Sequence, residues 1–167
     1  MMRGAVVAAK AAEHEAQEPS RRIVFVCTGN TCRSPMAAAV FNDLARKRGE
    51  GASAVSAGLF ATEGAPITPA AVQALQKAGI PPVEGLEYTA HCAHTVNAQD
   101  VADADLVVGL TASHAMQLTM RFPEAASKIG TLPMDIPDPY GGTQEEYDLC
   151  LASLRYCIEL AFFGELA

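Results

Sequence analysis

The chain has no run of eighteen apolar residues, the length that a membrane-spanning helix needs, although half of its 167 residues are apolar. Its charge is one-sided, because 19 acidic residues outnumber 12 basic ones and give a net charge of −7. No basic cluster is interleaved with aromatic residues. A general nucleic-acid-binding surface is therefore excluded, and we expect neither nucleic acid nor a membrane as a partner.

Cysteine and metal-ligand patterns are also sparse. The five cysteines are odd in number and follow no secretory signal, which favours a reducing cytoplasm over a disulfide framework. Cys92 lies between His91 and His94, but no second pair of ligands at zinc spacing follows. We therefore expect a cytoplasmic protein that binds no metal. We also expect a monomer and no cofactor.

The length of the chain fits one domain, which we place at residues 21–167. Residues 1–20 differ from the rest, since they are rich in Ala and Glu. Their short apolar stretch is interrupted by Lys10, whereas the apolar core of a signal peptide would be longer. We interpret residues 1–20 as a flexible N-terminal extension.

One segment carries most of the information. The apolar run 23–26 predicts a buried strand, while Ser34 as N-cap and Pro35 at the first helical position predict the start of a helix. Residues 27–34, Cys-Thr-Gly-Asn-Thr-Cys-Arg-Ser, would then form a tight loop between the two. Such a loop directs backbone N–H groups and a helix dipole at one point, as phosphate-binding sites do.

The side chains of this loop suggest a nucleophile. Only a few per cent of a free cysteine is thiolate at neutral pH, and a guanidinium, a helix N-terminus and N–H groups all favour the thiolate of Cys27. Arg33 offers a planar fork that matches two phosphoryl oxygens. Gly29 and Asn30 tolerate positive φ, so the loop can curl around an anion. The simpler reading is a buried cysteine beside an ordinary turn.

Strands and helices alternate beyond the loop. This alternation predicts an α/β fold: a single-domain three-layer sandwich with a short parallel sheet, helices on both faces and the phosphate-binding loop after the first strand. Cys150 and Cys157 lie on one face of the expected C-terminal helix, and we expect them to be buried as small hydrophobic residues. The expected helices are 35–48, 68–78, a short one around 99–101, one around 116–120 and a long one at 144–163; the expected strands are 54–57, a small one near 88–89, and 106–109.

Residues 26–37 resemble the signature of the low-molecular-weight cysteine-dependent protein phosphatases. The resemblance continues with Ser56-Ala57-Gly58, with residues 104–108 and with the loop Asp138-Pro139-Tyr140-Gly141-Gly142, and it covers roughly residues 22–165. It implies that Cys27 is the nucleophile of a thiophosphate intermediate and that Arg33 stabilises the transition state. It further implies phosphate contacts from the remaining loop residues, namely Thr28, Gly29, Asn30, Thr31, Cys32 and Ser34.

The resemblance also assigns supporting roles. Asp138 would protonate the leaving group and then activate water, although Asp-Pro with Gly-Gly is also an ordinary turn sequence. Asp135 fits less well, because the family's acid directly precedes proline. Ser34 would stabilise the thiolate, and Ser56 and His91 would brace Asn30.

Two further residues have open interpretations. Tyr140 would form an aromatic wall at the cleft mouth, or else it is one more exposed loop tyrosine. Cys32 could protect the nucleophile in a reversible disulfide with Cys27, or it could simply pack.

Thr31 bears on the choice of substrate. This position is more often aliphatic in phosphotyrosine-specific relatives, whereas the loop as it stands resembles the branch that acts on phosphoarginine in proteins. A Thr hydroxyl suits a polar phosphoguanidino group, which the Asp138 carboxylate could also engage. Phe60-Ala61 and Gly141-Gly142 resemble the same branch. We therefore expect phosphorylated proteins as partners, with phosphoarginine as the substrate and phosphotyrosine as the alternative.

Two remoter functions share parts of this pattern. Arsenate reductases have the same cysteine loop, but their relay needs two further cysteines close together, and here Cys92 stands alone with Gln99 near the site of a partner. A phosphate-binding module would not need Arg33 or Asp138. Metal-free hydrolysis of an aryl phosphate distinguishes both from a phosphatase.

Overall fold

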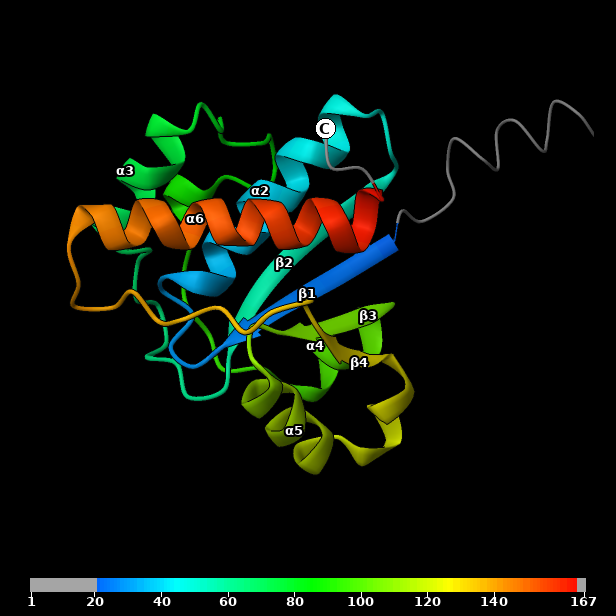
Figure 1. Ribbon diagram of the computed structural model, residues 1–167. Coiled ribbons are helices and arrows are strands. Elements are labelled where there is room, and N and C mark those ends of the chain that lie inside the picture. Colours follow the sequence, from blue (N-terminus) through cyan, green and yellow to red (C-terminus); the bar gives the residue numbers. More distant parts are fainter. Residues whose placement is uncertain (1–20, 165–167) are drawn as a thin grey trace, which may run out of the picture.

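The computed structural model describes residues 21–164, so the predicted extension at 1–20 lies outside the described residues. A sheet of four parallel strands forms its centre, with the order β2-β1-β3-β4 (Figure 1). Ile23 on β1 pairs with Ala54 on one side and with Leu106 on the other. The strands are β1 (Arg21–Cys27), β2 (Ala52–Gly58), β3 (Leu106–Gly109) and β4 (Ile129–Thr131).

Helices cover both faces of this sheet (Figure 1). One face carries α2 (Arg33–Lys47), α3 (Pro69–Lys77) and α6 (Gln144–Ile158), which continues as the π-helical turn η3 (Glu159–Phe163). The other face carries α4 (Ala98–Asp103), α5 (Ala112–Arg121) and the 3₁₀ helix η2 (Pro123–Lys128). The three-layer α/β architecture predicted from the sequence is therefore confirmed.

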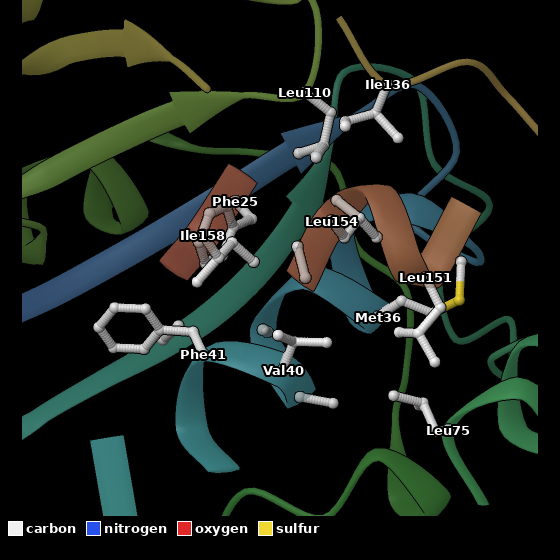
Figure 2. Packing of buried hydrophobic residues seen from close by; sticks show 14 of the residues in the cluster. Phe25, Met36, Val40, Phe41, Leu75, Leu110, Ile136, Leu151, Leu154 and Ile158 are labelled. Atoms are coloured by element: carbon white, nitrogen blue, oxygen red, sulfur yellow. The ribbon is translucent and has the colours of Figure 1, made fainter. Parts of the chain in front are cut away.

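Alternation along β1 builds the two cores, because successive side chains of a strand point to opposite faces. Ile23 and Phe25 join the cluster under α2, α3 and α6. Figure 2 shows Phe25 in this cluster together with residues of α6 such as Leu154. Val24 and Val26 join the cluster under α4 and α5. β1 is thus buried on both faces, which explains its continuous apolar sequence.

A side chain of α2 covers the outer edge of β2, the first strand in the order of the sheet. Asn42 is buried in that helix, and its side-chain amide donates to the carbonyl oxygen of Ala54 (3.0 Å) and accepts from the Ala54 N–H group (2.8 Å). One side chain therefore satisfies both backbone groups of a buried edge residue. Among residues 21–164, no helix is long and apolar enough to cross a membrane.

Three local predictions were wrong. The segment near Tyr88 is a 3₁₀ helix, η1 (Tyr88–Ala90), and not a strand, because the Tyr88 hydroxyl donates to the carbonyl oxygen of Ile80 and turns the segment into the core. α2 begins at Arg33 with Cys32 as its N-cap residue, so Ser34 does not cap it. Pro35 is the third residue of α2 and not the first, so the helix starts two residues earlier than predicted. Of the two loop residues that tolerate positive φ, Asn30 adopts it (59°).

Candidate active site

The loop between β1 and α2 surrounds the thiol of Cys27. Cys27 ends the central strand and is 2 % exposed. Its Sγ atom lies 2.9 Å from Ser34 Oγ and accepts from the backbone N–H of Asn30 at 3.3 Å. Both contacts, together with the N-terminus of α2, favour negative charge on the sulfur atom. The hydroxyl of Ser34 is thus used at the thiol and not as a helix cap.

Asn30 holds the loop in this shape. Its Nδ2 group donates to Ser34 Oγ (2.9 Å) and to Ser56 Oγ (3.0 Å), and its Oδ1 atom accepts from the backbone N–H of His94 (3.0 Å). His91 Nε2 lies 2.6 Å from the Asn30 carbonyl oxygen. Burial lowers the pKa of His91, so the neutral ring donates its Nε2 hydrogen to this carbonyl. The structure therefore brings Ser56 and His91 to the residue that they were predicted to brace.

Arg33 and Asp138 meet beside the thiol loop. Arg33 is 6 % exposed, and its Nη1 group donates to the carbonyl oxygen of Ile136 at 3.0 Å, which fixes the guanidinium. Its Nη2 atom lies 3.5 Å from Asp138 Oδ2, and half of the surface of that carboxylate is exposed. Asp135 faces elsewhere, because its carboxylate accepts from the backbone N–H of Ala112 at the start of α5. Of the two aspartates, Asp138 is the one at the pocket.

A pocket of about 510 Å³ opens over these groups. Tyr140 and Phe60 stand at its mouth, 71 % and 66 % exposed. Gly58 lets β2 approach the loop, since a Cβ atom there would lie 2.7 Å from the Thr28 carbonyl oxygen. The predicted site residues that line the pocket are Cys27, Thr28, Gly29, Asn30, Thr31, Cys32, Arg33, Asp138 and Tyr140.

The second loop cysteine is a free thiol with partners of its own. Cys32 Sγ lies 3.3 Å from the Tyr147 hydroxyl and 3.6 Å from Thr68 Oγ1. Burial and the contact with Cys32 raise the pKa of Tyr147 to about 12, so the phenol keeps its proton. These contacts support packing as the role of Cys32, and its pairing with Cys27 stays a prediction.

The other cysteines and histidines have structural surroundings. Cys150 and Cys157 are buried on α6 as predicted, and burial raises the pKa of Cys150 to about 12. Cys92 is exposed, and the neighbouring His94 binds Asp100 at 2.9 Å. Within residues 21–164, no three His, Cys, Asp or Glu side chains are grouped as a metal site would require.

Sequence reasoning missed two residues at the edge of the site. His114 on α5 is 5 % exposed, and its Nε2 atom lies 3.0 Å from Thr28 Oγ1. Arg121 donates to the carbonyl oxygen of Leu59 (2.8 Å), and its guanidinium lies over the Phe60 ring at 4.5 Å. Neither belongs to a local motif, because both lie on α5, 86 residues along the chain from Thr28 for His114 and 62 residues from Leu59 for Arg121.

Comparison with known proteins places this site in a family. Residues 22–162 match the family model described as low molecular weight phosphotyrosine protein phosphatase. A protein-arginine-phosphatase of Geobacillus stearothermophilus is 40% identical over 145 residues, which cover 83% of this chain and 91% of that protein.

Two solved structures have the same fold. The low molecular weight protein tyrosine phosphatase of T. tengcongensis has a TM-score of 0.79 and 38% identity, over 87% of this chain and 100% of that one. A YwlE arginine phosphatase mutant with a phosphorylated active-site serine has a TM-score of 0.74 and 31% identity, over 86% of this chain and 99% of that one. With the family model matching most of the sequence, the chain belongs to the low molecular weight phosphotyrosine protein phosphatase family.

Proposed function

We propose that the chain is a cysteine-dependent protein phosphatase that removes phosphate from phosphoarginine in proteins through a phosphocysteine intermediate. The observation that carries the proposal is the convergence at one pocket of the Cys27 thiol, the Arg33 guanidinium and the Asp138 carboxylate. A nucleophile, a transition-state cation and a proton donor are the groups that this reaction needs.

The first half-reaction transfers the phosphoryl group to sulfur. The Cys27 thiolate attacks phosphorus, a P–S bond forms, and the P–N bond to the guanidino group breaks. The leaving nitrogen takes a proton from Asp138, whose half-exposed carboxyl group can reach it. Arg33 supports the equatorial phosphoryl oxygens; its Nε–H group is buried without a protein partner among the described residues, and a phosphoryl oxygen would satisfy it.

The second half-reaction releases phosphate. Water attacks phosphorus, the P–S bond breaks, and the Asp138 carboxylate accepts the proton of that water. The electron pair returns to Cys27 as thiolate, which Ser34 Oγ and the Asn30 N–H group stabilise. Free arginine side chain and inorganic phosphate are the products.

Two observations support phosphoarginine as the substrate: a residue that lines the pocket and the name of a related protein. Thr31 lines the pocket with a side chain that carries a hydroxyl group, where an aliphatic side chain would favour an aryl ring. A relative that is 40% identical is named a protein-arginine-phosphatase. Phosphotyrosine is the second candidate, because Phe60 and Tyr140 offer aromatic surfaces at the mouth and a 38% identical structure is a tyrosine phosphatase.

Parallel rate measurements on one peptide sequence carrying phosphoarginine or phosphotyrosine test the substrate class. We expect a higher kcat/KM for the phosphoarginine peptide. A higher value for phosphotyrosine would assign the second candidate. If neither peptide nor an aryl phosphate is hydrolysed in the absence of metal, the chain is not a phosphatase, and a reductase or phosphate-binding role takes its place.

The Cys27→Ser variant tests the covalent mechanism. The hydroxyl is not ionised by this loop, whereas Arg33 and the backbone donors still bind phosphate, so turnover should fall below detection. Calorimetry with inorganic phosphate should show that binding is largely kept. Steady-state turnover by the pure variant would contradict a cysteine nucleophile.

A cytoplasmic location, a monomeric state and a domain that begins at residue 21 belong to the same proposal. All five cysteines are free thiols in the structure, which suits a reducing compartment. Sedimentation of the full chain would measure the oligomeric state.

A further inference from the structure

His114 reaches the phosphate-binding loop from the opposite layer of the fold. It lies in the first turn of α5, where its backbone N–H group donates to the side-chain oxygen of the N-cap residue Thr111 at 3.2 Å. Its Nε2 atom lies 3.0 Å from Thr28 Oγ1, and the ring is 5 % exposed. The close approach depends on Gly109 at the end of β3, because a Cβ atom there would lie 2.6 Å from the backbone nitrogen of Ala115.

The imidazole of His114 is neutral in the working enzyme. Burial and the nearby Arg33 guanidinium lower its pKa to about 4, while the carboxylates of Asp138 and Asp135 oppose this effect only in part. A neutral imidazole carries one hydrogen, on either Nδ1 or Nε2. The direction of the bond to Thr28 therefore depends on which nitrogen holds it.

The surroundings of Nδ1 decide between the two forms. Nδ1 is buried and has no hydrogen-bond partner among the described residues. A hydrogen there would leave a buried N–H donor unsatisfied, which is less favourable than a bare acceptor. The hydrogen is therefore on Nε2, so His114 donates to Thr28 Oγ1. The hydroxyl hydrogen of Thr28 must then point away from His114, and the exposed Thr28 side chain lines the active-site pocket.

We propose that His114 is a positioning residue for the phosphatase reaction: it holds the Thr28 hydroxyl so that the hydroxyl hydrogen is donated to a phosphoryl oxygen of the substrate. The inference rests on the proposed phosphatase activity but not on the choice of phosphoarginine. A donor to the phosphoryl group acts on every phosphorylated substrate, whereas Thr31 is assigned to the choice among them. The hydrogen bond from His114 also polarises the hydroxyl and strengthens its donation.

A double-mutant cycle tests the proposal with an aryl phosphate as substrate and inorganic phosphate as inhibitor. Thr28→Val and His114→Leu should each lower kcat/KM and weaken phosphate inhibition by about ten- to a hundredfold, as expected for a lost hydrogen bond to a charged group. The double variant should be no worse than the worse single one. His114→Gln keeps an N–H group near the Nε2 position, and Thr28→Ser keeps the hydroxyl, so both should recover most of the loss.

Ser113→Ala is the matched control, because this neighbour of His114 is exposed. Among residues 21–164, the Ser113 hydroxyl accepts a hydrogen bond only from the Gln117 side chain. It should behave as wild type. Additive losses in the double variant would show that His114 does not act through Thr28 and would overturn the proposal. So would wild-type kinetics and phosphate inhibition of Thr28→Val, a variant at an exposed position that does not depend on whether His114→Leu folds. Absence of hydrolysis by the wild type would instead contradict the proposed function.

Discussion

At the scale of single residues, Asn30 combines two properties that the loop requires. Its φ of 59° lies in the left-handed region, which Asn tolerates better than other residues with a side chain. Its amide contacts Ser34, Ser56 and the backbone of His94. Glycine would provide the conformation without the amide, and Gln the amide without the conformation. The loop is therefore fixed before substrate arrives, which is the preorganisation that electrostatic catalysis needs.

Asp138→Asn should separate proton donation from loop structure. The amide oxygen can still accept from the Tyr140 N–H group, as Asp138 Oδ1 does at 3.1 Å, but it has no proton to give. We expect kcat to fall by roughly 10²–10⁴ for a phosphopeptide and by much less for nitrophenyl phosphate, whose leaving group needs no proton. Asp135→Asn, which changes a carboxylate that binds the backbone at the start of α5, should keep near-normal rates. Equal losses on both substrates would mean that Asp138 only positions the loop.

Thr31→Ile should shift the substrate preference. The change replaces a pocket-lining side chain that carries a hydroxyl group with an apolar one, which suits an aryl ring and removes the polar contact proposed for a phosphoguanidino group. The ratio of kcat/KM for phosphoarginine to that for phosphotyrosine peptides should fall about ten- to two-hundredfold, or about 1–3 kcal/mol. Thr31→Ser, which keeps the hydroxyl, serves as the control. An unchanged ratio in Thr31→Ile would remove Thr31 from substrate selection.

At the scale of elements, α2 joins the site to the edge of the sheet. Its first turn carries Arg33 and Ser34 into the site, and its middle carries Asn42 to the outer edge of β2. The helix is buried from Arg33 to Ala45. A change in how α2 packs against β2 would therefore move Arg33 and Ser34 and so alter the phosphate-binding loop.

Asn42→Leu should destabilise the fold without removing a catalytic group. The variant leaves the N–H and C=O groups of Ala54 unpaired at a buried position, and each such group costs about 1–3 kcal/mol. Urea unfolding should show a loss of roughly 2–5 kcal/mol. Gln76→Leu, a similar replacement of an amide side chain by Leu at an exposed position of α3, should stay within about 0.5 kcal/mol of wild type. An equally small loss in Asn42→Leu would show that the two contacts contribute no net stability.

Elements with a strong local signal were predictable from the sequence. β1 contains a continuous apolar run, α2 and α6 have apolar residues at helical spacing, and Gly49 and Gly79 mark helix ends with φ of 65° and 72°. β4 was missed, because three residues centred on Gly130 carry no strand pattern and extend only by pairing with β3. Tyr88 suggested a strand by propensity, but its hydroxyl bond to Ile80 selected a 3₁₀ turn.

The residues of the candidate site also fall into a group that was predictable from the sequence and a group that was not. The phosphate-binding loop was predictable because its residues are contiguous and its chemistry follows from their order. His114 and Tyr147 were not, since their contacts with Thr28 and Cys32 span 86 and 115 residues and depend on how α5 and α6 cross the ends of the strands. No local pattern in either helix marks those side chains.

At the scale of the whole molecule, the central position of β1 explains why both helix layers reach one pocket. Cys27 ends β1, which lies between β2 and β3. From β1 the chain first adds β2 on one side of the sheet and then adds β3 and β4 on the other, so Cys27 lies at the topological switch point of the sheet. The layer of α2 and α6 contributes Arg33 and Tyr147, and the opposite layer contributes His114. The site is thus assembled only when both layers are packed on the sheet.

The two cores should nevertheless contribute to stability independently. Leu118 lies in the core under α5 and Ile158 in the core under α6, each 0 % exposed, and the sheet separates them. Leu118→Ala should cost about 2–5 kcal/mol and Ile158→Val about 0.5–1.5 kcal/mol. In urea unfolding the double variant should lose their sum to within about 0.5 kcal/mol, because the sites share no neighbours. Neither residue lines the pocket, so kcat/KM of the folded variants should stay near that of wild type. A deviation from additivity of more than about 1 kcal/mol would show that β1 transmits packing changes between the layers, and the site would then be sensitive to both.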